Sequence, residues 1–225
     1  SFNKEQSKLK VLLESADIIL MPNSKALKSL IAQLVESSAA RVIIFIAGSS
    51  GAHKAMHDIN ALSMTESFRF YLKHEQKPQM PYLPFAGISF GQQVATLSLA
   101  AYIKSTQENK TVKETIYLDQ SIKRTFDALY SNTDISNGHF LHNGAFPCYQ
   151  IYKTKDNHYI SLAAVEEKYW ENLIKNFNLP LTTEQRFDTT GKIKTLLENE
   201  FKQQSLEQIL NKCINSECCL SPCAN

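Results

Sequence analysis

The chain has 225 residues, of which 43% are hydrophobic and 20% charged, and its 24 basic and 22 acidic residues give a net charge of +2. This length suits one large domain or two small ones, and the basic residues form no long run of the kind that nucleic-acid binding requires. The longest apolar stretches, Val42 to Gly48 and Val94 to Ile103, are too short to span a bilayer, and the first ten residues lack the apolar core of a signal peptide. We therefore expect a cytoplasmic protein that binds neither membrane nor nucleic acid.

Helix and strand patterns alternate at the start of the chain. Residues 3–15 have apolar side chains at helical spacing and predict a helix that ends near Ser15, and "DIILM" (17–21) predicts a short buried strand. Residues 24–38 place their apolar side chains on one helical face, and "RVIIFIAG" (41–48) predicts a strand parallel to the first. Two strands do not form a stable sheet, so we expect further strands from elsewhere in the chain or from outside it.

The next segments are a proline-rich connection, a long helix and a strand that turns into a helix. "PQMPYLP" (78–84) excludes regular structure. Residues 85–105 predict a long apolar helix with Gly87 and Gly91 in the core, and residues 107–114 predict a polar connection. "TIYLDQSIKRTFDALYSN" then predicts a strand followed by a helix.

The pattern changes after Gly138. Residues 148–154 and 159–165 predict a hairpin around the turn "KDNH", and residues 166–179 predict a helix followed by further helices to Lys212. Tyr169 and Trp170 are expected to pack this helix against the hairpin. This part of the chain is an α+β module, distinct from the alternating strands and helices before it.

The cysteines raise the question of a metal site. Cys213, Cys218, Cys219 and Cys223 crowd the last thirteen residues, and Cys148 stands apart. Their spacing does not match two separated Cys-x-x-Cys pairs, and adjacent thiolates would strain one tetrahedral site. We favour free, partly buried thiols in a reducing compartment and expect no metal.

Three stretches in order resemble family III CoA-transferases, especially the branch with alpha-methylacyl-CoA racemase, and also the formyl-CoA transferases. They are "HDINALS" (57–63), the long segment 143–180 that contains the predicted hairpin and helix, and "ECCLSPCAN" (217–225). The resemblance implies an α/β fold with a partial Rossmann-like parallel sheet and a smaller α+β domain. Family members are longer, so the chain looks truncated, without their N-terminal strand–helix units and last C-terminal segment.

The resemblance also implies a domain organisation. We expect a partial large Rossmann-like domain over residues 1–140, a small α+β domain over 141–212 and a return segment over 213–225. Family members form dimers in which two protomers interlock. A homodimer, or a missing complementary segment, would cover the apolar surface of the incomplete sheet.

The resemblance assigns candidate catalytic residues. His57 matches the histidine that removes the α-proton of an acyl-CoA thioester, and Asp58 is the neighbour that could orient it. Glu166 matches a glutamate that hydrogen-bonds this histidine, which would make the imidazole a better base. Lys25 and Lys28 lie where the family has an Arg-Pro-Gly segment that holds the CoA phosphates, but a lysine lacks the bidentate grip of arginine.

One expected catalytic group is missing. The family aspartate that reprotonates the substrate, or attacks it in the transferase branch, precedes Phe-Ala-Gly, and here Pro84 stands at that position. Proline can neither donate a proton nor attack a carbonyl. No aspartate lies between Asp58 and Asp119, although Glu66 and Glu75 fall in that window. The sequence thus predicts a relative without the parent racemase or transferase activity.

Other interpretations stay open. His57 could be a hydrogen-bonded core histidine, and Asp58 could be a helix N-cap. The chain could instead be an active acyl-CoA enzyme (racemase, epimerase or CoA-transferase) that uses His57, or a protein-interaction module with an open sheet edge. No cofactor is expected, with a CoA thioester as ligand or substrate. The sequence leaves open whether the chain is an enzyme and which acyl group it would take.

Overall fold

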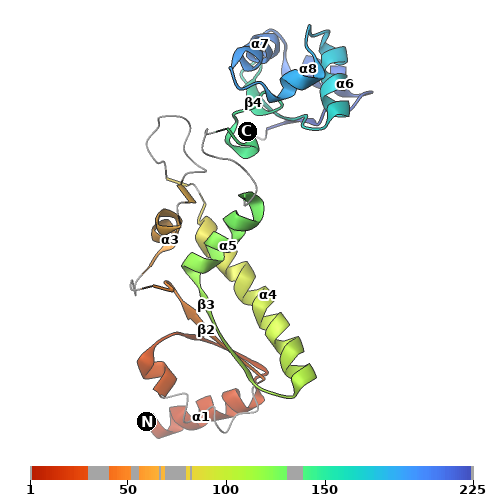
Figure 1. The fold of residues 1–225 in the computed structure, drawn as a ribbon. Helices are drawn as coiled ribbons and strands as arrows, with labels where there is room; N and C mark the ends of the chain where they lie inside the picture. The colour runs from red at the N-terminus through yellow and green to blue at the C-terminus, as the bar shows by residue number, and fades with distance from the viewer. Residues whose placement is uncertain are drawn as a thin grey trace. The chain divides into compact units, whose positions relative to one another are not determined.

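The computed structural model describes residues 2–29, 41–51, 56–65, 67–68, 80–81, 83–130 and 139–223 (Figure 1). These divide into two compact units. The described residues up to Tyr130 form the first unit, and those from His139 onward form the second. Each unit has its own sheet and its own hydrophobic core.

The first unit contains a parallel sheet of three strands in the order β1-β2-β3. The strands are β1 (Ile18–Pro22), β2 (Val42–Ala47) and β3 (Val112–Tyr117). The predicted parallel pairing of the first two strands is confirmed, with Ile18 opposite Val42. The prediction of a polar connection over residues 107–114 is wrong at its end, because Val112, Lys113 and Glu114 begin β3. They pair with β2 through their backbones while the Lys113 and Glu114 side chains are exposed, so their polarity hid the strand.

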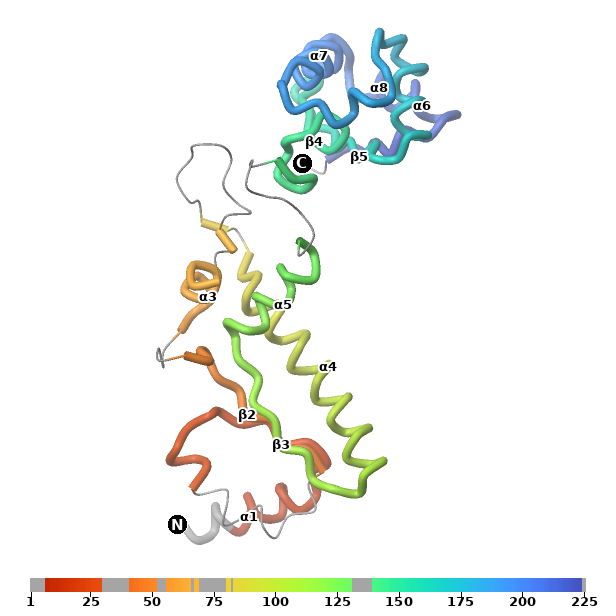
Figure 2. Tube along the Cα trace, in the orientation of Figure 1, coloured from red at the N-terminus to blue at the C-terminus, as the bar shows by residue number. Residues whose placement is uncertain are grey.

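Helices cover both faces of this sheet (Figure 2). The helix α1 (Phe2–Ser15) ends where predicted and packs Leu13 against Ile19, Met21 and Ile43. On the other face, the long helix α4 (Phe85–Glu108) packs Ala101 against alternate strand residues, namely Val42, Ile44 and Ile116. The central strand β2 is therefore apolar on both faces, as its β-branched run predicted.

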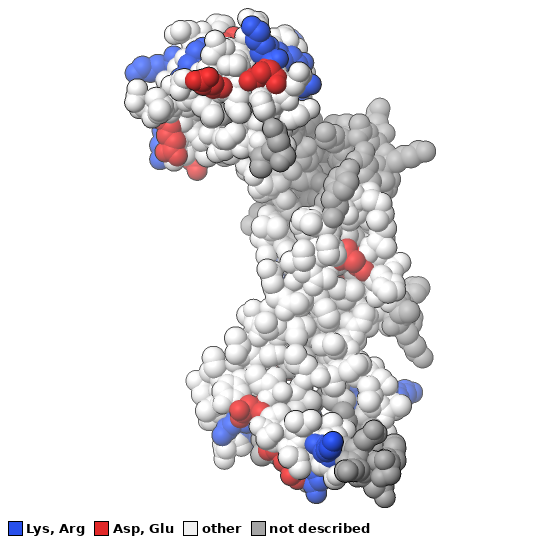
Figure 3. Space-filling view, turned by 180° about the vertical axis from the view of Figure 1, so that it is seen from behind, with Lys and Arg blue, Asp and Glu red and all other residues white. Residues whose placement is uncertain are grey.

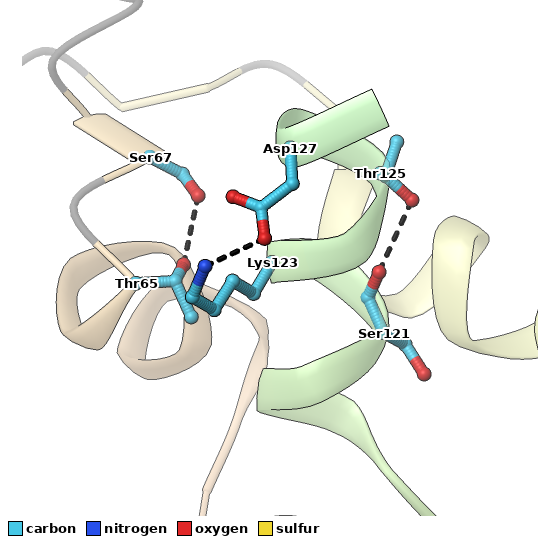
Figure 4. Close-up of polar contacts among 6 residues, drawn as sticks. All are labelled: Thr65, Ser67, Ser121, Lys123, Thr125 and Asp127. Atoms are coloured by element: carbon cyan, nitrogen blue, oxygen red, sulfur yellow. Dashed lines mark hydrogen bonds and ion pairs between the residues drawn. The ribbon is translucent and has the colours of Figure 1, made fainter. Parts of the chain in front are cut away.

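Two further helices pack against α4 in the first unit. The helices α3 (Asp58–Met64) and α5 (Leu118–Tyr130) share with α4 a cluster formed by Ala61, Leu62, Ala86, Leu118 and Ile122. Figure 4 shows the facing parts of α3 and α5, including the Lys123–Asp127 ion pair of 2.6 Å along α5. The Thr65 hydroxyl closes α3 by donating to the Ala61 carbonyl at 2.7 Å and pairs with the Ser67 hydroxyl.

Two predictions for the first unit agree with the structure only in part or not at all. Of the predicted helix 24–38, residues 25–29 are helical and residues 30–38 lie outside the described residues. The expectation that Gly87 and Gly91 lie in the core is wrong, because both are exposed. The helix α4 turns a different stripe, including Ser98 and Ala101, toward the sheet.

The second unit combines an antiparallel sheet with three α-helices. Its strands are β4 (Tyr149–Lys153), β5 (Tyr159–Ala163) and β6 (Leu220–Pro222). Its helices are α6 (Glu167–Phe177), α7 (Lys192–Phe201) and α8 (Leu206–Cys213), with short 3-10 helices η2 (Leu141–Asn143) and η3 (Thr183–Phe187). The predicted hairpin is confirmed, with Tyr152 opposite Ile160. The strand β6 was not predicted, because three residues ending in proline carry no strand pattern of their own, and it pairs with β5.

A single core holds the second unit together. Trp170 of α6 is fully buried and donates its indole N–H to the Thr182 carbonyl at 3.0 Å. Tyr169 packs at the border of the same cluster, so the predicted packing of this helix is confirmed. The helix α6 ends at Asn178, whose left-handed backbone (φ 50°) is a common helix stop.

None of the helices in the described parts of the chain is both long enough and apolar enough to cross a membrane.

Candidate functional site

His57 lies at the start of α3. Its backbone is extended (φ −106°, ψ 174°), it is the N-cap residue of the helix, and its N–H donates to Asn60 Oδ1 at 3.0 Å. The residue is exposed, so the interpretation of a core histidine is wrong. Because the side chain is open to solvent, a ligand can reach the imidazole without a rearrangement of the core.

Asp58 caps a helix, but not its own. The N-cap of α3 is His57, and Asp58 Oδ1 accepts a hydrogen bond of 2.7 Å from the backbone N–H of Gly87. Gly87 is the third residue of α4, and the N–H groups of the first turn have no partner within their helix. A carboxylate at this end also interacts favourably with the helix dipole. Asp58 therefore connects the start of α3 to the start of α4.

Pro84 explains why α4 needs an acceptor from another element. Pro84 is the N-cap residue of α4, is exposed and makes no side-chain hydrogen bond to the helix. Its carbonyl accepts from the N–H of Ile88 at 2.9 Å, as in any first turn. Its ring has no oxygen with which to cap the next amides, and Asp58 supplies that oxygen.

Glu166 belongs to the second unit. It is the exposed N-cap residue of α6, and its backbone carbonyl accepts from the N–H groups of Tyr169 and Trp170 at 3.1 and 3.2 Å. Burial raises the pKa of the Cys219 thiol, and the negative charge of Glu166 raises it further. Since His57 lies in the other unit, a hydrogen bond between His57 and Glu166 stays a prediction.

Lys25 and Lys28 are both exposed in the helical segment that follows β1. The segment begins at Ser24, whose carbonyl accepts from the Lys28 N–H at 2.8 Å. The Lys28 ammonium lies 4.5 Å from the centre of the Phe45 ring of β2, within cation–π range. The two lysines thus stand near the carboxyl ends of β1 and β2, the edge at which open parallel sheets bind ligands.

Asp119 is a structural residue of this edge that the sequence did not reveal. It lies at the start of α5, is only 8% exposed, and its Oδ2 accepts from Ser50 N–H at 2.9 Å and from the Ser49 and Ser50 hydroxyls at 3.3 and 3.0 Å. It thereby fixes Ser49 and Ser50, which follow β2 and Gly48 in the chain. Its only sequence signal is an acidic residue directly after a strand pattern, which is also common in ordinary helix starts.

The remaining candidates are the cysteines and two glutamates. All five cysteines are unpaired, with Cys148 and Cys218 buried. Among the residues that the structure describes, no three His, Cys, Asp or Glu side chains gather as a metal site. Glu66 and Glu75, the other carboxylates considered near the expected aspartate, lie outside the described residues.

Comparison with known proteins identifies the fold. The chain superposes on a CAIB/BAIF family protein from Brucella suis with a TM-score of 0.75 and 16% identity, over 99% of this chain and 64% of that one. A hypothetical protein from Mycobacterium tuberculosis gives a TM-score of 0.73 at 12% identity, over 94% of this chain and 62% of that one. These likenesses confirm the predicted α/β fold, which is that of these structures.

Sequence comparison identifies the family. A CaiB/baiF CoA-transferase family protein from Caenorhabditis elegans is 27% identical over 176 residues, which are 74% of this chain and 50% of the relative. The chain thus matches about half the length of this curated relative. The profile of CoA-transferase family III matches residues 3–225, nearly the whole sequence. The predicted resemblance is confirmed, and the chain belongs to CoA-transferase family III.

Proposed function

We propose that this chain binds CoA thioesters but has lost the racemase and transferase reactions of its relatives. Family membership supports an acyl-CoA ligand. Racemisation needs two proton-transfer groups on opposite faces of the α-carbon, and acyl transfer needs a nucleophile. In this chain Pro84 stands where the resemblance expects the aspartate that would serve as the acid or the nucleophile.

The start of α4 carries this proposal. A proline at the N-cap supplies neither a carboxylate nor a cap, and Asp58, a carboxylate that does lie at this helix end, accepts a hydrogen bond from Gly87 N–H at 2.7 Å. If Asp58 left this bond to act on a substrate, an amide of the first turn of α4 would lose its acceptor. Asp58 therefore serves to hold α3 and α4 together, and does not replace the missing acid.

Two measurements test the proposal. CoA and a series of acyl-CoAs should raise the melting temperature, because a ligand that binds the native state stabilises it. Replacing both Lys25 and Lys28 by alanine should reduce this shift, whereas Lys104→Ala, an exposed lysine near the end of α4, should not. A chiral 2-methylacyl-CoA should keep its configuration, and no acyl group should pass to an acceptor acid. Racemisation or transfer above background would overturn the proposed loss of activity.

A second candidate is one-base chemistry at His57, with Glu166 behind the imidazole. The observation in its favour is that both side chains are exposed and thus available to a ligand. In heavy water such an enzyme would place deuterium at the α-carbon of an acyl-CoA while keeping its configuration. General-base catalysis is worth about a hundred- to ten-thousand-fold, so the exchange would be detectable. We expect wild type and His57→Ala to exchange at the same background rate. Exchange that His57→Ala abolishes would establish this second candidate.

We also propose that the first unit associates with a second copy of the chain. Leu99 and Ile103 on the outer side of α4 are 61% and 58% exposed, and residues 85–103 of this helix include no charged side chain. On the side of the first unit that Figure 3 shows, most charged residues gather at the lower end of the unit, and few lie over the rest of its described surface. An uncharged apolar face can meet its own copy without like-charge repulsion. Sedimentation that shows a monomer over a wide concentration range would contradict this association.

A further inference from the structure

Two cysteines meet where α8 ends and the chain turns toward β6. Cys213 is the last residue of α8 and is partly buried, and Cys218 is 1% exposed. Between them the Ser216 N–H donates to the Cys213 carbonyl at 3.4 Å, which folds the segment into a tight turn. Cys213 packs against the core cluster that includes Cys218. The turn thus brings Cys213 and Cys218, five residues apart in the sequence, to the same core cluster.

The helix α6 holds this turn with two asparagines one helical turn apart. Asn176 Nδ2 donates to Cys218 Sγ at 3.2 Å and to the Ser216 carbonyl at 3.0 Å. Asn172 Nδ2 donates to the Glu217 carbonyl at 2.8 Å. Both fix the backbone of the turn, but only Asn176 touches a sulfur. An N–H donor on a sulfur favours the thiolate, because it stabilises the negative charge.

The two thiols also interact with one another. A hydrogen bond from the Cys213 thiol lowers the pKa of Cys218, and the same bond together with burial raises the pKa of Cys213. One sulfur of the pair is thus prepared to lose its proton while the other keeps it. Such pairs of unequal thiols are typical of cysteines that exchange disulfides.

We propose that Cys213 and Cys218 are a redox modification site, which forms a reversible disulfide across the α8–β6 turn by exchange with a low-molecular-weight disulfide. The more exposed Cys213 is the sulfur that the small disulfide reaches. The buried Cys218, held by Asn176, completes the bond within the protein.

The reaction proceeds in two steps. The Cys218 thiolate takes the proton of Cys213, its hydrogen-bond partner, and the Cys213 sulfur bonds to one sulfur of the small disulfide. The bond between the two small-molecule sulfurs breaks, and the leaving thiolate takes up from solvent the proton that Cys218 had released. Cys218 then attacks Cys213 Sγ, which breaks the mixed disulfide and releases the second small thiol with the Cys218 proton. In total the protein pair loses two electrons and two protons, and one small disulfide becomes two thiols.

The other cysteines of this region are held differently. The backbone carbonyl of Cys219 accepts from Ala163 N–H at 2.9 Å, and the Cys223 N–H donates to the Tyr159 carbonyl at 2.8 Å, so both are tied to β5. Cys148 lies at the start of β4, fully buried. These three provide internal controls for the proposed pair.

The test uses the full chain in glutathione buffers of graded ratio of reduced to oxidised form, followed by alkylation of the remaining thiols. Cleavage after Glu217 separates Cys213 from the other three C-terminal cysteines, and mass spectrometry then identifies the linked peptides. We expect the linked species to join Cys213 to the peptide that starts at Cys218, to disappear on addition of reduced glutathione, and to persist in Cys219→Ser and Cys223→Ser. It should be absent from Cys213→Ser and Cys218→Ser.

The two asparagines separate a redox role from a structural one. Asn176→Ala should shift the glutathione ratio at which half of the pair is oxidised, whereas Asn172→Ala, which also removes a bond to the turn, should leave that ratio unchanged. If Cys213→Ser and Cys218→Ser fail to fold, mapping the linkage in Cys219→Ser and Cys223→Ser still decides the partner. Linkage of Cys213 to Cys219 or Cys223, or a stable mixed disulfide with glutathione alone, would overturn the proposal.

Discussion

The two units of this chain differ in how their apolar side chains are used. The second unit has one continuous core around Trp170, with a sheet on one side and helices on the other. The first unit spreads its buried residues over three smaller clusters and leaves Leu99 and Ile103 of α4 exposed. Burial of apolar area is the main stabilising term in folding. Among the described residues, the unit with His57 and Asp58 therefore divides its buried apolar area among smaller clusters, and we expect single contacts to matter more for its stability.

The largest effect should come from the core of the second unit. Trp170→Ala should cost about 3–5 kcal/mol of the free energy of unfolding, because it leaves a large cavity and an unpaired Thr182 carbonyl. Trp170 is the only tryptophan, so circular dichroism in urea is the suitable measurement. Tyr169→Ala, at the border of the cluster, is the matched control and should cost clearly less. Equal losses in both variants would contradict a core centred on Trp170.

Alkaline pH should also weaken the second unit. Burial raises the pKa of the Cys148 thiol from about 9 to about 11, so the folded state keeps a proton that the unfolded chain releases. The stabilisation from Cys148 is therefore complete below pH 9 and is lost as the pH rises to 11, by about 2 kcal/mol. Urea unfolding of wild type and Cys148→Ala at several pH values measures this loss. The other titrating groups, such as Tyr152, are present in both proteins, so the difference between the two pH dependences isolates Cys148. A slope that Cys148→Ala leaves unchanged would contradict this assignment.

In the first unit, the contact between Asp58 and α4 should have a smaller effect. Asp58→Ala should lower the free energy of unfolding by about 1 kcal/mol, the usual value of a helix cap. Pro84→Asp should supply a new cap at the same helix end, so that Asp58→Ala costs less in that background. A double-mutant cycle measures the coupling. If the two changes are simply additive, Asp58 and the residue at position 84 do not share this role.

A substitution on the exposed face of α4 should have the smallest effect on folding. Leu99→Glu should change the free energy of unfolding of the isolated chain by less than about 0.5 kcal/mol, as is usual for exposed positions. It should nevertheless weaken self-association in sedimentation, because it places a charge in an apolar contact. Leu12→Glu on α1 adds the same charge at another exposed leucine and should leave association unchanged. If both variants dissociate alike, the contact is not centred on α4.

The sequence determined much of this protein by itself. The β-branched run of β2, the long apolar pattern of α4 and the hairpin of β4 and β5 each carry a complete local pattern, which fixes the type of element. For β2 the pattern also fixes burial on both faces, whereas α4 buries a different stripe from the one predicted. The same local information supports the family, because its motifs are read from neighbouring residues. The sequence also shows that residue 84 is a proline, whose side chain cannot act as an acid in any fold.

Tertiary structure alone decided which groups these residues meet. The strand β6 exists because β5 offers it a free edge, and the first residues of β3 become a strand because β2 pairs with them. Asp58 became the cap of α4, Asp119 the anchor of Ser50, and Asn176 a partner of Cys218, although none of these pairs is close in sequence. Periodicity reports which side of an element is buried, but a hydrogen bond needs a donor and an acceptor within about 3 Å. That distance is set by how elements pack, and no local pattern contains it.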